Sequence, residues 1–394
     1  MIWTVIHVVD FALWFFLAIS VAYCAFFAFA SLFRRHQRTD YPESPQHRFL
    51  ILFPAYHEDK VIVDSIQQFL RQEYPTELFC VVVISDHMSD DTNRQLGDFP
   101  ITLLQPNFEK SSKAMAMQYA INYFEERGSE ATAFDYVVVL DADNMVNTDF
   151  LSRLNQLCNA GFEAIQCHRC AKNSNNNVAV LDGASEEINN TLFRLAHNAL
   201  GLSSALIGSG MCFSYRLFVD NVFQLSTAGE DRELEALLMR KGVFIKYADT
   251  IDVFDEKVSC QDNFQRQRMR WMTAQVQSLT SMLPYVPKAI VTGNIDFIDK
   301  TFQQTLIPRS MLLVAIAFFA LLMSVFSPIW SVKWWLLLAV LILSIIVALP
   351  ARMRTHTLLC NAVAFPGMVW RMVKNLFHID RKNTDFLHTT HDIK

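Results

Sequence analysis

The most constraining feature of the sequence is an apolar run that ends abruptly in two carboxylates. It reads Val137-Val138-Val139-Leu140-Asp141-Ala142-Asp143. Such a run is short enough for a buried strand and too short for a typical helix. In an open α/β sheet, ligands bind beyond the carboxyl ends of the strands. The sequence therefore predicts an acidic site at the end of a buried strand.

The spacing of the two carboxylates indicates the ligand. In an extended chain, residues two apart point to the same side, so Asp141 and Asp143 are expected to face one cation. Mg²⁺ or Mn²⁺ is commonly held by one or two carboxylates together with phosphate oxygens of a substrate. We predict a metal and diphosphate site with Asp143 and Asp141 as the metal ligands. The alternative is an ordinary Asp-x-Asp loop that caps the next helix.

Composition points to a membrane rather than to nucleic acid. Of 394 residues, 52% are hydrophobic and only 19% are charged, which is rich for a purely soluble protein. The net charge of -5 gives no indication of a nucleic-acid partner. Among eight cysteines, only Cys167 and Cys170 have metal-like spacing, and two reduced buried thiols are the favoured interpretation over a zinc or redox site.

Residues 11–33 contain no charged side chain and, at about 1.5 Å per residue, span about 34 Å, enough to cross a bilayer. Residues 1–10 contain no Lys or Arg, whereas Arg34, Arg35 and Arg38 follow the apolar stretch. We therefore expect an uncleaved anchor over 1–34, a linker over 35–48, and a cytoplasmic domain after it.

Two further uncharged stretches, 310–330 and 334–351, predict a hairpin of two membrane spans within 305–351. Arg352 and Arg354 follow the second span, so both ends of the hairpin are expected on the cytoplasmic side of the cell membrane. Within 352–394, the amphipathic stretch 358–377 predicts a helix on the membrane surface.

Between residues 49 and 258, apolar runs alternate with helical patterns, which favours an α/β domain with a mainly parallel sheet. The expected strands are 49–53, 79–85, 101–104, 136–140, 164–167 and 207–214. The expected helices are 60–72, 111–126 and 178–201.

Polar residues follow three of these strands. Tyr56 and Glu58 follow the first, Asp86 ends the second, and Lys113 opens the helix after the third. An aromatic ring for a base, carboxylates for its donors and a lysine for phosphate would together form a nucleotide site. Taken singly, Lys113 could be a solvated surface lysine, which is the commoner fate of any one lysine.

Two motifs follow in the second half of the domain. Gly208-Ser209-Gly210 interrupts a strand-like run, which usually marks a bulge or a close approach of a ligand to the backbone. Gly229-Glu230-Asp231 begins a helix to about residue 241, where acids in the first turn are also favoured by the helix dipole alone.

A helix over 263–283, within the region 259–300, carries Gln267-Arg268-Met269-Arg270-Trp271. Its apolar residues recur at three- and four-residue spacing, which is typical of a helix lying on a membrane surface. That interpretation explains the apolar stripe but not the two arginines beside Trp271.

In their order and spacing, these motifs resemble those of the membrane-bound family-2 glycosyltransferases, the inverting group that includes cellulose, chitin and hyaluronan synthases. Asp86, Asp141-Ala142-Asp143 and Gly229-Glu230-Asp231 match the three aspartate motifs of that group, and residues 267–271 match its Gln-x-x-Arg-Trp motif. The last aspartate motif is usually written Thr-Glu-Asp, so Gly229 is a departure.

The resemblance implies a GT-A fold, a Rossmann-like mainly parallel sheet, with transmembrane and interfacial helices. It also implies a nucleoside-diphosphate sugar donor, with a UDP-sugar favoured, and Mg²⁺ or Mn²⁺. The implied donor-binding residues are Tyr56, Glu58, Asp86, Lys113, Asp141, Arg268 and Arg270. The implied acceptor-binding residues are Gln267, Trp271, Gly208, Ser209 and Gly210, and the catalytic residues are Asp231, as general base, and Glu230. Thr389 and His391 resemble a gating segment over the nucleotide.

Three functions remain open at this stage. The first is synthesis of a polysaccharide or oligosaccharide at the cytoplasmic membrane face, and the second is transfer of one sugar to a lipid acceptor. The third is a membrane scaffold that binds nucleotide without catalysis. The sequence identifies neither the sugar, the linkage, nor any export or accessory subunit.

Overall fold

The computed structural model describes residues 2–33, 41–128, 134–172, 177–227, 229–256 and 261–355, without the side chains of 2, 177–178 and 261–270. The expected surface helix over 358–377 and the gating residues Thr389 and His391 lie outside these ranges and stay predictions.

An eight-stranded mixed sheet forms the centre of the domain, in the order β3-β2-β1-β4-β7-β6-β8-β5. The strands are β1 (Phe49–Tyr56), β2 (Phe79–Asp86), β3 (Thr102–Leu104), β4 (Tyr136–Val139), β5 (Met145–Val146), β6 (Ala164–Ala171), β7 (Met211–Ser214) and β8 (Ile245–Asp255). β1 pairs in parallel with both β2 and β4, and β2 pairs in parallel with β3. β7 runs antiparallel to both β4 and β6. The predicted α/β domain with a mainly parallel sheet is confirmed.

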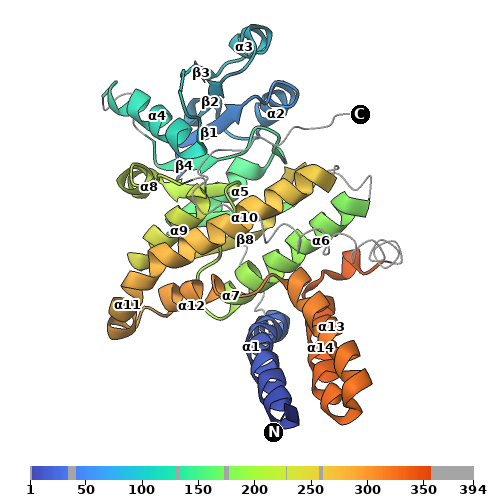
Figure 1. The fold of residues 1–394 in the computed structure, drawn as a ribbon. Helices are drawn as coiled ribbons and strands as arrows, with labels where there is room; N and C mark the ends of the chain where they lie inside the picture. The colour runs from blue at the N-terminus through green and yellow to red at the C-terminus, as the bar shows by residue number, and fades with distance from the viewer. Residues whose placement is uncertain are drawn as a thin grey trace.

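Helices cover both faces of the sheet (Figure 1). The helices are α1 (Ile2–Ala30), α2 (Ile62–Phe69), α3 (Asp90–Gly97), α4 (Lys113–Glu125), α5 (Phe150–Asn159), α6 (Asn177–Asn190), α7 (Ala196–Ala199), α8 (Tyr215–Val222), α9 (Glu230–Arg240), α10 (Gln261–Met282), α11 (Val286–Thr292), α12 (Ile295–Gln303), α13 (Arg309–Phe326) and α14 (Pro328–Ala348). α2 and α5 pack on one face, and α4, α8 and α9 on the other. Because both faces are covered, the central strands are continuously apolar rather than alternating.

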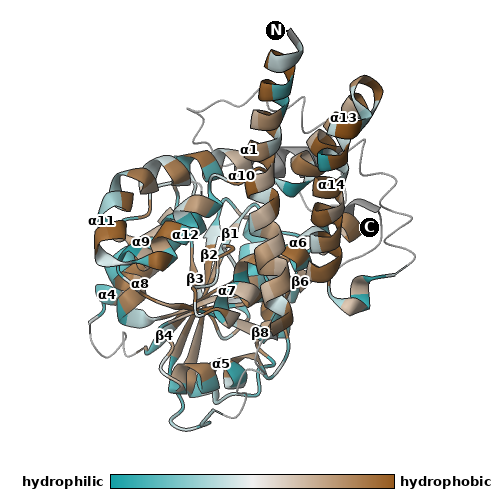
Figure 2. Ribbon diagram, turned by 90° about the horizontal axis from the view of Figure 1, so that it is seen from below, coloured by the Kyte–Doolittle hydropathy of each residue, from teal (hydrophilic) through white to brown (hydrophobic). Residues whose placement is uncertain are grey.

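Helices α1, α13 and α14 extend together from one side of the domain (Figure 1), and many of their residues are hydrophobic (Figure 2). All three are long and apolar enough to cross a membrane. The break between α13 and α14 falls at Ser327, several residues earlier than the predicted turn. Pro328 explains the difference, since proline ends a preceding helix and fits the first turn of the next.

One ion pair is buried among these apolar helices. Asp10 of α1 pairs with Lys333 of α14, and Trp334 Nε1 donates a 2.8 Å hydrogen bond to Asp10 Oδ1. The ammonium group of Lys333 also lies 4.5 Å from the centre of the Trp330 ring. The pair explains how α1 tolerates an acid that is only 6% exposed.

The inner end of α1 is joined to the sheet domain by a polar group that we call the junction cluster: Tyr23, His197 and Asp299. Tyr23 Oη donates to Asp299 Oδ1 over 2.8 Å, and His197 Nε2 lies 3.0 Å from Asp299 Oδ2. The Phe27 ring stacks on the His197 ring at 3.9 Å. The first apolar helix is therefore packed against α7 and α12.

Helix α10 is packed against the domain more closely than a helix lying on a membrane surface would be. Met282, one residue of that stripe, is 1% exposed and packs in the core on the α9 side of the sheet. Val276 is 45% exposed and Leu283 is 51% exposed. Lipid contact by this helix therefore remains a prediction for its exposed residues alone.

Candidate active site

The ends of three parallel strands bring the predicted residues to one edge of the sheet. In the register of β1 and β2, Tyr56 is the direct partner of Asp86. β4 lies on the other side of β1 and leads into Asp141. Residues from three distant parts of the chain therefore meet at the carboxyl edge, as the strand pattern predicts.

Two histidines that were not predicted lie beside Tyr56 and Asp86. The Oδ1 atom of buried Asp86 is 2.5 Å from His87 Nδ1. The Tyr56 ring centre is 4.4 Å from that of His57 and 5.6 Å from that of His87. Both histidines have φ of 55°, a conformation that non-glycine residues seldom adopt and that clusters at functional sites. Their position directly after two strand ends was the available sequence signal.

Glu58 follows this group, with its backbone N–H 3.0 Å from Met88 Sδ. The contact joins the loop after β1 to the loop after β2. Together with the Tyr56 ring and the Asp86 carboxylate, the two loops offer ring faces and hydrogen-bond acceptors. Such groups suit a nucleoside, whose base stacks and whose ribose hydroxyls donate.

Lys113 lies at the centre of the acidic groups. Its ammonium group donates to Asp141 Oδ1 and to the carbonyl oxygen of Gly208, the latter over 2.7 Å, and lies 4.0 Å from Glu230 Oε1. Burial lowers the pKa of Lys113, but the charges of Asp141 and Glu230 outweigh burial, so the pKa is raised overall. Lys113 is therefore a fixed cation and not a solvated surface lysine.

Glu230 and Asp231 begin α9 beside this lysine. Burial, followed by the negative charge of Asp231, raises the pKa of Glu230 to about 7, while Lys113 opposes the increase. A Cβ atom placed on Gly208 would lie 3.6 Å from Asp231 Oδ2 and 3.6 Å from Glu230 Oε1. Gly208, with φ of 81°, therefore lies directly beside the two carboxylates.

The turn at Gly208-Ser209-Gly210 also fixes the loop after β4. Ser209 Oγ donates to Asn144 Oδ1, and both oxygens accept from the backbone N–H of Asp141, at 3.2 and 3.0 Å. Gly210 has φ of 64°, and a Cβ atom there would lie 2.9 Å from Val253 Cγ2. A glycine is required at this position by both conformation and space.

Asp141 and Asp143 contact different partners. The chain turns at Ala142 and Asp143, so the extended geometry behind the expectation that both acids face one cation does not continue past the strand. Asp141 pairs with Lys113, whereas Asp143 is buried and accepts from the Glu256 backbone N–H at 3.2 Å and from Asn144 Nδ2 at 3.1 Å.

A third carboxylate, which was not predicted, lies near Asp143. Asp255 ends β8, and its Oδ1 atom is 3.4 Å from the same Asn144 Nδ2 atom. Arg169 Nε lies 3.9 Å from Asp255 Oδ2. Asp141, Asp143 and Asp255 offer oxygen ligands only, which is the donor set that Mg²⁺ and Mn²⁺ prefer, so the chemistry of their side chains fits the predicted ion.

A second cluster, His168, Cys170 and Asp252, has ligand atoms within 4.8 Å of one another. His168 Nδ1 lies 2.7 Å from Asp252 Oδ1, and its Nε2 lies 3.1 Å from Glu187 Oε2. Burial lowers the pKa of His168, but the hydrogen bonds to the two carboxylates raise it to about 9. A protonated imidazole has no lone pair for a metal, so we interpret this cluster as structural. Cys167 and Cys170 are both buried, and Cys170 Sγ lies 3.8 Å from the Val253 carbonyl oxygen.

The Gln-x-x-Arg-Trp segment lies on α10. The backbone of Gln267, Arg268 and Arg270 is helical, and their side chains are outside the described part of the structure. Trp271 is half-buried. Three residues further along the helix, Ala274 contacts the start of α9, since a Cβ atom on Gly229 would lie 3.0 Å from Ala274 Cβ. α10 therefore passes beside the helix that carries Asp231.

The fold and this edge of the sheet define a glycosyltransferase with a GT-A-like α/β fold. The family model described as "Glycosyltransferase like family 2" matches residues 45–274, more than half of the chain. The protein belongs to that family.

One solved structure agrees on the fold, and a second is reported as a weaker match. The mannosyltransferase PcManGT from Pyrobaculum calidifontis, in complex with GDP-Man and Mn²⁺, matches with a TM-score of 0.52 at 17% identity, over 84% of this chain and 97% of that chain. Glucosyl-3-phosphoglycerate synthase from Mycobacterium tuberculosis, with Mn²⁺, UDP and phosphoglyceric acid, matches with a TM-score of 0.42 at 16% identity, over 62% and 84% of the two chains. A comparison with curated protein sequences found no match.

Proposed function

We propose that this glycosyltransferase inverts the anomeric centre while it transfers a sugar from a nucleoside-diphosphate donor to a growing polysaccharide or oligosaccharide. The observation that carries the proposal is the meeting of Lys113, Asp141, Glu230 and Asp231 beside Gly208. A lysine cation and two adjacent carboxylates thus lie at the carboxyl edge of the sheet. This arrangement suits a reaction that moves one proton and releases one diphosphate.

The donor is assigned to the β1 and β2 side of the site. Tyr56, Glu58 and Asp86 would bind the base and ribose, and Lys113 and Asp141 the diphosphate, with Arg268 and Arg270 from α10. Asp143, with Asp141, would hold Mg²⁺ or Mn²⁺, which when bound neutralises charge on the leaving diphosphate. The PcManGT complex contains GDP-Man and Mn²⁺, which supports a donor of this class for the fold.

The acceptor is assigned to the side of Gly208 and α10. Asp231 would take the proton of the acceptor hydroxyl as it attacks, a role that typically contributes about 10²–10⁴-fold to the rate. Glu230, with its pKa raised to about 7, would stay beside Lys113 and limit the negative charge next to Asp231. Trp271, Gln267 and the turn 208–210 would contact the acceptor sugar. Attack opposite the leaving group gives a β-linkage from an α-linked donor.

The reaction is assigned to the cytoplasmic face of a cell membrane. α1, α13 and α14 supply three helices able to cross a bilayer, and arginines follow α1 and α14 in the sequence. By the positive-inside rule, these arginines support a cytoplasmic location for the domain.

The test uses the full-length protein purified in detergent and returned to lipid vesicles. Released nucleoside diphosphate is measured with UDP-glucose, UDP-N-acetylglucosamine, UDP-galactose and GDP-mannose, each with Mg²⁺ or Mn²⁺, followed by mass spectrometry of the product. A ladder of sugars supports a polymerising enzyme, whereas addition of one sugar to a lipid supports the alternative. Absence of turnover with every donor would contradict both.

Two variants test the assigned roles. Asp231→Asn preserves shape but removes the base, so transfer should fall at least ~10²-fold while donor binding persists. Asp143→Ala should abolish metal-dependent turnover and weaken Mn²⁺ binding, measured by electron paramagnetic resonance. An Asp231→Asn enzyme that loses donor affinity but keeps its turnover number would show that Asp231 binds donor.

A further inference from the structure

Gly229, which immediately precedes α9, lies close to Ala274 of α10. A Cβ atom on Gly229 would lie 3.0 Å from Ala274 Cβ, which is closer than almost all such contacts. Gly229 has φ of -113°, outside the left-handed region that favours glycine. The glycine is therefore needed for space and not for backbone conformation.

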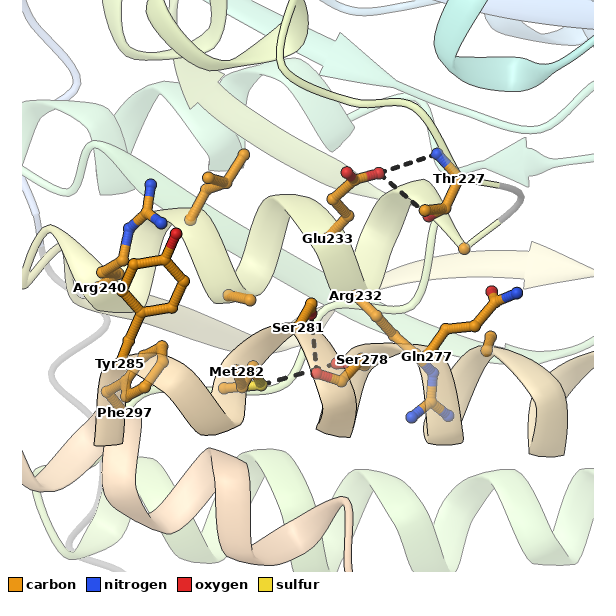
Figure 3. Close-up of a pocket in the computed structure, with 14 residues that line it drawn as sticks. Thr227, Arg232, Glu233, Arg240, Gln277, Ser278, Ser281, Met282, Tyr285 and Phe297 are labelled. Atoms are coloured by element: carbon orange, nitrogen blue, oxygen red, sulfur yellow. Dashed lines mark hydrogen bonds between the residues drawn. The ribbon is translucent and has the colours of Figure 1, made fainter. Parts of the chain in front are cut away.

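Elsewhere along the same pair of helices, longer side chains intervene. A pocket of about 200 Å³ lies between α9 and the segment from α10 to Tyr285 (Figure 3). Its lining includes Arg232, Glu233 and Arg240 of α9, Gln277 and Ser281 of α10, and Tyr285. Gly229 and Ala274 line the same pocket. Because Gly229 and Ala274 are both small, the start of α9 and helix α10 can approach each other closely at this part of the pocket lining.

The contact lies between two parts of the candidate site. Gly229 is two residues before Asp231, and Ala274 is three residues after Trp271, which is about 4.5 Å along a helix. Neither residue touches Lys113, Asp141 or Asp143 in the contacts described above. The contact thus joins the element that carries the assigned base to the helix that carries the assigned acceptor residue.

We propose that Gly229 and Ala274 form a positioning contact that sets the distance between Asp231 and Trp271, and so the placement of the acceptor hydroxyl against the base. This inference rests on the proposed function. Any side chain at position 229 would need more room than this contact leaves.

The experiment enlarges the contact from either side and then relieves it. Gly229→Ala and, from the opposite helix, Ala274→Ser are expected to lower kcat about 10-fold or more, because misplacement of reacting groups by about 1 Å costs up to about 10²-fold. The KM for the nucleotide sugar selected by the donor screen should change less than kcat, because Lys113 and Asp141 lie outside this contact. Combining Gly229→Ala with Ala274→Gly should restore most of the lost kcat.

Two controls separate positioning from general destabilisation. Gly97→Ala makes the same chemical change where a Cβ atom would meet nothing within 4 Å, so kcat should not change. Thr280→Gly weakens α10 as a helix at an exposed position, and should not rescue Gly229→Ala. Unfolding temperatures of all variants are measured alongside.

The inference is overturned if Gly229→Ala and Ala274→Ser keep wild-type kcat, if the double variant recovers nothing, or if the loss appears in the donor KM alone. If Gly229→Ala does not fold, Ala274→Ser alone decides. A wild-type enzyme that transfers sugar while these variants behave normally would refute the positioning contact and leave the proposed function intact. A wild-type enzyme without transfer would refute the function itself.

Discussion

The ammonium group of Lys113, at the first turn of α4, donates a hydrogen bond to Asp141, which follows β4. The same nitrogen reaches the Gly208 carbonyl oxygen at 2.7 Å and lies 4.0 Å from Glu230 Oε1. A positive charge is therefore built into the site before any substrate binds. Preorganised charge of this kind is available without reorganisation when negative charge develops on a leaving group.

Lys113→Met should raise the donor KM and lower turnover about 10²-fold or more, because it leaves Asp141 and Glu230 without their cation. Steady-state release of nucleoside diphosphate measures both constants. Lys288→Met, on the exposed surface of α11, is the matched control and should be silent. Equal losses in the two variants would show that Lys113 has no particular role in the site.

Glu230→Gln should change the pH dependence of stability. The pKa of Glu230 is raised to about 7, so its stabilising contribution is complete below about 4.5 and is lost as the pH rises through about 7. Glutamine does not titrate. Relative to wild type, the variant should therefore gain of the order of 1–3 kcal/mol between pH 4.5 and pH 8. Thermal unfolding at the two pH values measures this, and a difference independent of pH would contradict the assignment.

His168→Gln should show a pH dependence of stability with the same sign, at higher pH. Its pKa is raised to about 9 by Asp252 and Glu187, so the stability that protonation contributes is complete below about 6.5 and is lost as the pH rises through about 9. The variant should be less stable than wild type by about 1–3 kcal/mol at pH 6.5, and the gap should narrow at pH 10. If zinc analysis instead finds bound metal that His168→Gln removes, the cluster is a metal site.

The ion pair between Asp10 and Lys333 predicts that substitutions in α1 and α14 have non-additive effects on stability. Lys333→Met leaves a buried acid without its cation, and breaking such a pair typically costs about 3–5 kcal/mol. The double variant Asp10→Asn with Lys333→Met should be more stable than Lys333→Met alone. Unfolding in detergent measures the set, and additive losses would indicate that the two residues do not interact.

The sequence predicted the first half of the sheet closely and missed β8. Strands such as β1 are continuously apolar because both faces are covered, and that pattern is local. β8 pairs with β6 through a register shift, with Cys167 opposite Ala248 but His168 opposite Asp252. The bulge disrupts the two-residue period in both strands, so the pattern of β6 stopped at Cys167 and β8 went unrecognised.

The same irregularity hid part of the candidate site. Asp255 ends β8, so without that strand nothing in the sequence placed its carboxylate near Asp143. The turn after Leu140 had a similar effect, because the prediction assumed that side chains continue to alternate between the two faces past the strand end. The separate partners of Asp141 and Asp143 depend on tertiary contacts. Motif spacing identified which residues meet, whereas their pairing required the folded chain.

The junction cluster has a consequence for how the first helix can be exchanged. Tyr23 contacts both His197 and Asp299, and Phe27 stacks on His197, so α1 presents a specific polar and aromatic surface at its inner end. Another hydrophobic helix of equal length would insert into a bilayer equally well and would still leave His197 and Asp299 without these partners. Hydropathy alone therefore does not make another apolar helix a substitute for α1, and a chimaera or truncation that replaces α1 also disturbs the part of the sheet domain that contains His197 and Asp299.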